Sequence, residues 1–237
     1  SMPVYNTAAY EFDTAEAMEE AFCGRTADHA YSRITNPTVQ YFEKRIQTIT
    51  GALSVTALNS GMAAISNIFF TLAQAGANIV TSAHLFGNTY SFFKSTLAAF
   101  GVEVRFCDLT NPEAVRAQVD ENTCAVFLEV ITNPQLEVAD LKVLSGIAHQ
   151  IGAPLIADTT VVPFHIFHAN EFGVDIEIVS STKYISGGAT SLGGLILDYG
   201  TFDWRNSKKL RSMADQFGAS TFTAKLRKEI HSNLSAY

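Results

Sequence analysis

Short apolar segments alternate with helix-forming segments from residue 53 to residue 197, and this alternation restricts the fold more than any other feature of the sequence. The apolar segments, such as 124–128 and 155–157, are continuous runs rather than alternating apolar and polar residues. Continuous runs are typical of parallel strands that are covered on both faces. Because strands that alternate with helices form parallel sheets, we expect a three-layer α/β fold, with a mostly parallel sheet and helices on both faces.

The order of the expected elements follows directly from this alternation. The strands are 53–58, 78–82, 102–106, 124–130, 154–157, 175–179 and 192–197. The helices are 15–22, 37–50, 61–74, 89–100, 112–119, 141–151 and 217–234. Residues 24–37 are polar and predict a loop. It leads into a helix that Asn36 caps, that has Pro37 in its first turn and that stops at Gly51.

The charge balance argues against a nucleic-acid-binding protein. Asp and Glu number 23 against 16 Lys and Arg, a net charge of −7, whereas nucleic-acid binding requires a basic surface. Apolar residues make up 47% of the chain, which is too many for a disordered protein. The best apolar run, 124–131, is interrupted by Glu129 and is shorter than the ~20 residues that cross a membrane. We therefore expect neither nucleic acid nor membrane as a partner.

The cysteines and the first residues favour the cytoplasm. Cys23, Cys107 and Cys124 are odd in number and form no Cys-x-x-Cys pair, which argues against a disulfide scaffold or a zinc ribbon. The chain begins without the basic and apolar regions of a secretory signal. We therefore expect a cytoplasmic protein.

Ligands of parallel α/β sheets bind at the carboxyl ends of the strands, so the segments that follow the strands are the candidate site. The first of them is 59–62, between a strand and a helix. Gly61 lets the backbone approach a ligand closely, and the helix start presents free N–H groups to an anion. The alternative is an ordinary turn in which Ser60 caps the helix.

Two charged residues follow later strands. Asp158 is costly to bury without a partner, so it predicts a carboxylate that faces a protonated ring nitrogen or a metal; the alternative is a helix cap or a solvated loop. Lys183 follows a buried strand between the hydroxyls of Ser180 and Thr182. A desolvated lysine can form a Schiff base, and the hydroxyls could hold a phosphate. The alternative is a solvated surface lysine.

Other motifs narrow the choice of ligand. Gly-x-Gly-x-x-Gly after a strand and the P-loop pattern are both missing. His165-x-x-His168 has no third ligand at a suitable spacing, so we expect no metal. Arg33 beside Tyr31 suits phosphate binding, with a surface loop as the alternative. A helix start that binds an anion, a strand-end Asp, a Lys between hydroxyls and an Arg/Tyr loop together are the parts of a pyridoxal phosphate site.

With these features the chain resembles the Cys/Met-metabolism family of pyridoxal-phosphate enzymes, over essentially its whole length. The segments that carry the resemblance are Tyr31-Ser32-Arg33-Ile34-Thr35-Asn36-Pro37-Thr38, Ser60-Gly61-Met62-Ala63-Ala64, Asn133-Pro134, Asp158 with Thr160, and Ser180-Ser181-Thr182-Lys183-Tyr184 with Gly187-Gly188. Within the family, residues 36–39, 85–90 and 200–204 are most similar to O-acetylhomoserine sulfhydrylases. The resemblance implies the large domain of the fold type I aminotransferases.

The resemblance also implies roles for individual residues. Lys183 is expected to bond to the cofactor as a Schiff base and then to move protons. Asp158 is expected to keep the pyridine nitrogen protonated, so that the ring accepts electrons. The cofactor phosphate is expected to be held by the backbone of Gly61 and Met62 and by the hydroxyls of Ser180 and Thr182.

Four more residues complete the expected site. Phe86 takes the place of the family's usual Tyr; it can stack on the ring but has no hydroxyl for proton transfer. Asn133 is expected near the cofactor hydroxyl and the substrate carboxylate. Tyr31 and Arg33 are expected to reach the phosphate of a neighbouring subunit in a homodimer or homotetramer.

The implied domains are an N-terminal arm and helix, 1–50, that contacts the partner subunit, and a cofactor-binding large domain, 51–237. The family's C-terminal domain is expected to be absent, so that this fragment is inactive alone and the helix 217–234 exposes its apolar face or packs on a partner. The implied reaction is γ-replacement on O-acetyl-L-homoserine by sulfide or a thiol, giving homocysteine or methionine. The alternatives are cystathionine γ-synthase, methionine γ-lyase, and a catalytically silent oligomerisation or docking module.

Overall fold

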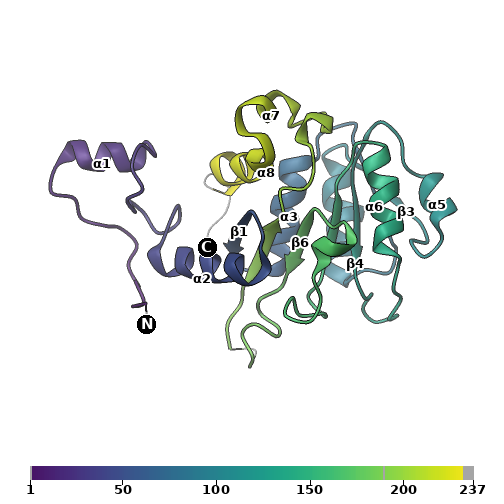
Figure 1. Ribbon diagram of the computed structural model, residues 1–237, viewed down its shortest axis with the longest axis horizontal. Helices are drawn as coiled ribbons and strands as arrows, with labels where there is room; N and C mark the ends of the chain where they lie inside the picture. The colour runs from purple at the N-terminus through teal and green to yellow at the C-terminus, as the bar shows by residue number, and fades with distance from the viewer. Residues whose placement is uncertain (1, 189, 232–237) are drawn as a thin grey trace.

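The computed structural model describes residues 2–188 and 190–231, and its centre is a seven-stranded sheet with the order β1-β7-β6-β5-β4-β2-β3 (Figure 1). The strands are β1 (Ser54–Leu58), β2 (Asn78–Thr81), β3 (Glu103–Phe106), β4 (Thr123–Glu129), β5 (Leu155–Asp158), β6 (Ile176–Val179) and β7 (Gly194–Asp198). All strands are parallel except β7, which runs antiparallel to both of its neighbours, β1 and β6. The expected mostly parallel sheet is confirmed, with strand ends that differ from the sequence prediction by one or two residues.

Local sequence signals set the ends of the helices. The longer helices are α1 (Ala15–Phe22), α2 (Pro37–Thr50), α3 (Gly61–Leu72), α6 (Leu141–Gln150) and α7 (Arg211–Phe217). The Asn36 side chain accepts hydrogen bonds from the first turn of α2, and Gly51 ends this helix in the left-handed conformation with φ 71°. Both capping predictions are confirmed.

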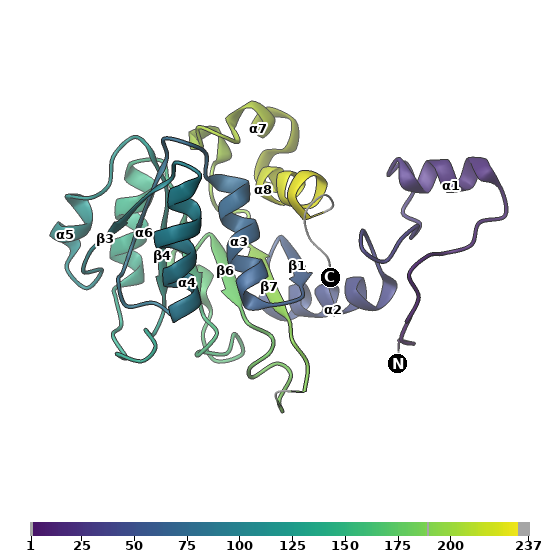
Figure 2. The ribbon, with the colours of Figure 1, turned by 180° about the vertical axis from the view of Figure 1, so that it is seen from behind.

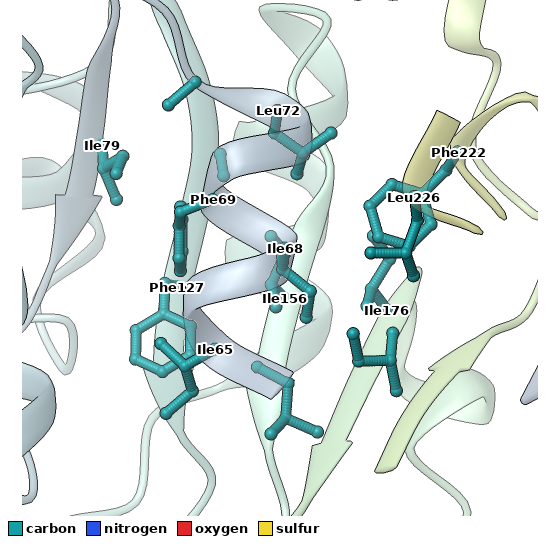
Figure 3. Close-up of a cluster of buried hydrophobic side chains, with 14 of the residues drawn as sticks. Ile65, Ile68, Phe69, Leu72, Ile79, Phe127, Ile156, Ile176, Phe222 and Leu226 are labelled. Atoms are coloured by element: carbon teal, nitrogen blue, oxygen red, sulfur yellow. The ribbon is translucent and has the colours of Figure 1, made fainter. Parts of the chain in front are cut away.

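Helices cover both faces of the sheet. The first face carries α3, the π-helical turn η1 (Phe92–Leu97) that continues α4 (Gly87–Ser91), and α8 (Thr221–Lys225) with its continuation η5 (Leu226–His231). The second face carries α2, α5 (Pro112–Arg116) and α6. Figure 3 shows side chains of α3 packed between Phe127 of β4 on one side and Phe222 and Leu226 on the other. Successive residues of β4 enter opposite cores, which explains why its sequence is apolar without alternation.

Three predicted helices, 61–74, 112–119 and 141–151, end one to three residues earlier in the structure, and two others differ more. The helix expected at 89–100 begins at Gly87. Its N-cap residue is Phe86, whose side chain makes no capping hydrogen bond, so the sequence carried no signal for this start. The helix expected at 217–234 does not begin at Phe217, because Phe217 is the last residue of α7 and Gly218, with a φ of 54°, ends that helix. A 3-10 turn, η4 (Gly218–Ser220), leads into α8 at Thr221, and helical structure continues to His231, while 232–234 lie outside the described residues.

The apolar face of this last helical segment is buried rather than exposed. Phe222 and Leu226 have no exposed surface and pack into the core on the α3 face of the sheet. Phe222 also stacks on Trp204, with ring centroids 5.4 Å apart. The expectation of an exposed or partner-covered face is therefore wrong, because α3 supplies the apolar surface that covers it.

The N-terminal residues extend away from the sheet. Figures 1 and 2 show α1 and its flanking loops at one end of the molecule, joined to the body through α2. A single bridge, between Ala9 and Tyr31, closes this segment on itself. Among the residues that the structure describes, no helix combines the length and the apolar character needed to cross a membrane.

Candidate functional site

The candidate residues gather at one edge of the sheet. Parallel strands end together, so the loops after β1, β2, β4, β5 and β6 meet at this edge, together with the start of the antiparallel β7. The chain leaves β2 toward β3 on one side and leaves β4 toward β5 on the other. A reversal of this kind between neighbouring strands opens a crevice in which ligands of α/β sheets bind.

The start of α3 contacts the segment after β6. A Cβ atom on Gly61 would lie 2.9 Å from the Ser180 Cβ, which is too close for any larger residue. Ser60 caps the helix by accepting a hydrogen bond of 3.0 Å from the Ala63 N–H. The N–H groups of Gly61 and Met62 have no acceptor among the described residues. The structure thus combines both interpretations of this segment, a capped turn and an open anion-binding helix start.

Asp158 and Ser180 are joined through Thr160. Asp158 accepts a hydrogen bond of 2.9 Å from the Thr160 N–H, and the Thr160 hydroxyl accepts one of 2.8 Å from the Ser180 N–H. Burial raises the pKa of Asp158, and the bonds from Thr160 oppose this shift only in part. No described cationic side chain pairs with Asp158, so the charge compensation that its burial calls for is still missing.

Lys183 lies in a turn after β6, and its position differs from the expectation. The residue is exposed rather than desolvated, because residues 181–186 turn away from the end of the buried strand. Its N–H bonds to the Ser180 carbonyl at 3.2 Å, which keeps both residues in one turn. The Thr182 hydroxyl is already shared with the backbone of Gly193, with distances of 3.0 and 3.2 Å. Of the two hydroxyls predicted to bind phosphate, that of Thr182 is therefore already hydrogen-bonded, whereas that of Ser180 is more available.

Phe86 and Asn133 are held by a residue that the sequence analysis did not select. The Phe86 N–H donates to Glu129 Oε1 at 2.5 Å, and the Asn133 N–H donates to Glu129 Oε2 at 3.1 Å. Phe86 is 47% exposed, in the loop after β2 at this edge of the sheet. Glu129 itself is only 7% exposed, and burial together with the charge of Asp158 raises its pKa to about 7. The only sequence signal was a charged residue at the end of an apolar run.

Tyr31 and Arg33 lie outside this edge. They belong to the N-terminal segment that Figure 1 shows extending from the body, and the Arg33 guanidinium lies 5.4 Å from the centre of the Tyr31 ring. The structure therefore keeps the two residues together without bringing them to the site of their own chain. Within residues 2–188 and 190–231, His165 and His168 belong to no group of metal-ligating side chains.

A comparison with protein families places nearly the whole chain in one of them. The model of the family described as Cys/Met metabolism PLP-dependent enzyme matches residues 1–226. A curated relative, the O-acetyl-L-homoserine sulfhydrylase of Corynebacterium glutamicum, is 38% identical over 209 residues, which are 88% of this chain and 48% of the relative. The chain thus spans about half the length of that protein.

Solved structures agree with this comparison. The chain superposes on the O-acetylhomoserine sulfhydrylase of Wolinella succinogenes with a TM-score of 0.79 and 48% identity, over 86% of this chain and 60% of the other. It also superposes, with a TM-score of 0.79 and 32% identity, on a Campylobacter jejuni protein over 84% of this chain and 47% of the other. That structure contains N'-pyridoxyl-lysine-5'-monophosphate, a lysine bonded to the cofactor.

Proposed function

Because this chain belongs to the Cys/Met metabolism PLP-dependent enzyme family, we propose that it is the cofactor-binding part of an enzyme that replaces the γ-substituent of O-acetyl-L-homoserine by sulfide or a thiol. The products would be homocysteine or methionine. The observation that carries the proposal is the linked set Gly61, Ser180 and Asp158 at one edge of the sheet. Such a set offers donors for a phosphate at one end and a carboxylate at the other.

The residues present fit pyridoxal phosphate. The free N–H groups of Gly61 and Met62 and the hydroxyl of Ser180 are donors of the kind that a phosphate requires. We assign the Thr182 hydroxyl to the same phosphate, to which it would donate in place of the Gly193 carbonyl. The buried Asp158 has no cationic partner among the described residues, and a protonated ring nitrogen would supply one. When bound, pyridoxal phosphate supplies an electron-withdrawing ring that stabilises negative charge on the substrate.

The chain's own residues would orient the substrate and move protons. We assign to Lys183 the covalent attachment of the cofactor and the proton transfers at the α- and β-carbons of the substrate. Phe86 would cover one face of the ring without taking part in proton transfer, because it has no hydroxyl. Asn133 would orient the substrate carboxylate through its amide.

We propose that Tyr31 and Arg33 complete the site of a second copy, in a homodimer or homotetramer. Their position on an arm that extends from the body supports this assignment, because an arm can reach a neighbour's sheet edge. An Arg beside a Tyr suits a phosphate that is shared across such an interface. The free thiols of Cys23, Cys107 and Cys124 favour a cytoplasmic enzyme.

The first test is cofactor attachment. Pyridoxal phosphate is added to the purified chain, the visible absorbance is recorded, and the bond is reduced with borohydride before peptide mapping. We expect a single labelled peptide that contains Lys183. Label spread over surface lysines, or no label, would contradict the assignment of the site.

The second test is product analysis with the full-length protein. O-acetylhomoserine plus sulfide is compared with methionine alone. We expect homocysteine from the first mixture and no cleavage of the second. Cleavage of methionine without formation of homocysteine would replace γ-replacement by a lyase reaction.

A further inference from the structure

The carboxylate of Glu129 holds the backbones of two separate loops at the candidate site. Glu129 is the last residue of β4, and its two oxygens accept N–H bonds from Phe86, 43 residues earlier, and from Asn133, four residues later. Phe86 follows β2, so the carboxylate joins the loop after β2 to the loop after β4, where the strand order reverses. Hydrogen bonds to a buried charged acceptor are among the stronger ones in proteins.

A second link between the same loops is weaker. His84 and Glu137 form a pair at 2.7 Å, but their side chains are 46% and 40% exposed. Exposed pairs of this kind contribute little, because solvent competes for both groups. Glu129 is therefore the main polar connection between the loop after β2 and the loop after β4.

A buried carboxylate at this position is unfavourable, yet a neutral glutamine could not make the same two hydrogen bonds. Glu129 is buried, it lies in register with Asp158 on β5, and neither residue forms an ion pair with a described side chain. A glutamine would avoid the repulsion between the carboxylates of Glu129 and Asp158. However, it has one acceptor oxygen and would turn its own N–H groups toward one of the two donors. Only a carboxylate accepts both bonds.

We propose that Glu129 is a positioning residue, which fixes the backbones at Phe86 and Asn133 through the two oxygens of one carboxylate. It thereby sets where these two residues meet pyridoxal phosphate and the substrate. The part that concerns cofactor and substrate rests on the proposed function. The carboxylate clamp itself rests on the contacts of Glu129 alone, so the two parts can be tested separately.

The test of the clamp uses the chain without cofactor. The amide resonances of Phe86 and Asn133 are followed by NMR as the pH is raised from 5 to 9. We expect both to titrate together with the Glu129 carboxyl in the wild type, and neither to show that step in Glu129→Gln. The Asp158 carboxyl faces Glu129 from β5, and His84 and Glu137 lie in the two loops, so Asp158→Asn and Glu137→Gln are titrated in parallel. Separate titrations of the two amides, or a common step that survives in Glu129→Gln, would overturn the clamp.

The test of positioning compares cofactor affinity in two matched variants. Asp198→Asn is the control, because Asp198 is also a buried strand-end carboxylate that accepts an N–H bond, from Gly200 at 2.9 Å, but at the opposite edge of the sheet. We expect Glu129→Gln to weaken the binding of pyridoxal phosphate roughly tenfold and Asp198→Asn to leave it unchanged.

The outcomes separate the clamp from the proposed function. Equal weakening in both variants, or no weakening in Glu129→Gln, would overturn the positioning role. If the wild type itself takes up no cofactor while the two amides titrate together, the proposed function fails and the clamp stands. If Glu129→Gln does not fold, the wild-type titration still decides whether one carboxylate holds both loops.

Discussion

Glu129 and Asp158 lie side by side at the carboxyl ends of β4 and β5, paired in register and on the face of the sheet that α3 covers. Burial raises the pKa of both carboxyl groups, and the charge of Asp158 raises that of Glu129 further. The pKa of Glu129 is raised to about 7, and that of Asp158 is also raised. Negative charge on these two carboxyl groups is therefore unfavourable, and a bound cation would relieve that cost.

This pair predicts how stability changes with pH. The folded chain holds the proton of Glu129 more tightly than the unfolded chain. Protonation of Glu129 therefore stabilises the fold fully below pH 4.5, and this stabilisation is lost as pH rises through 7. The expected loss is on the order of 3 kcal/mol in the free energy of unfolding, and it should be largely absent in Glu129→Gln. Urea unfolding at several pH values measures it. An unchanged pH slope in Glu129→Gln would contradict the raised pKa.

The approach of Gly61 to Ser180 predicts that Gly61→Ala damages the site. The added Cβ would lie 2.9 Å from the Ser180 Cβ, so the helix start or the segment after β6 must shift. We expect a destabilisation of about 1–3 kcal/mol and a clear loss of affinity for pyridoxal phosphate, measured by absorbance titration. Gly146→Ala is the control, since no atom lies within 4 Å of its added Cβ and Ala favours a helix. Equal affinities in the two variants would argue against a ligand at Gly61.

The packing of Phe222 predicts that the last helical segment is essential to the core. Its side chain has no exposed surface and stacks on Trp204. We expect Phe222→Ala to lower the free energy of unfolding by about 3–5 kcal/mol, and Phe100→Ala, with a side chain 64% exposed, to cost less than about 1 kcal/mol. Thermal and urea unfolding compare the two. A small effect of Phe222→Ala would mean that the segment is only loosely attached.

Because Phe86 has no hydroxyl, we predict that Phe86→Tyr increases turnover. The side chain is 47% exposed, so the added hydroxyl should leave stability within about 0.5 kcal/mol of the wild type. We expect an increase in turnover of roughly tenfold or more with an unchanged affinity for cofactor, because the hydroxyl can exchange a proton with the substrate. Phe86→Leu is the paired variant, and it should lose cofactor affinity with the aromatic face. No change in turnover in Phe86→Tyr would show that proton transfer at this position does not limit the reaction.

The extended arm predicts that two inactive copies complement each other. Full-length proteins that carry either Arg33→Ala or Lys183→Ala are unfolded, mixed in equal amounts and refolded. If Arg33 serves the neighbouring site, hybrid dimers contain one intact site, and about a quarter of the wild-type activity should return. Mixtures that stay inactive, although mass spectrometry detects hybrids, would place Arg33 in its own chain's site.

The sequence by itself determined the strands, most helices and the caps at Asn36 and Gly51, because continuous apolar runs and helix signals act between residues that are close along the chain. It also identified Asp158 and Ser180, since each follows a strand directly. Only the tertiary structure decided the antiparallel insertion of β7, the burial of Phe222 and the exposure of Lys183. The role of Glu129 is of the same kind. Its acceptor bond to Phe86 spans 43 residues, and strand order alone brings those two residues together.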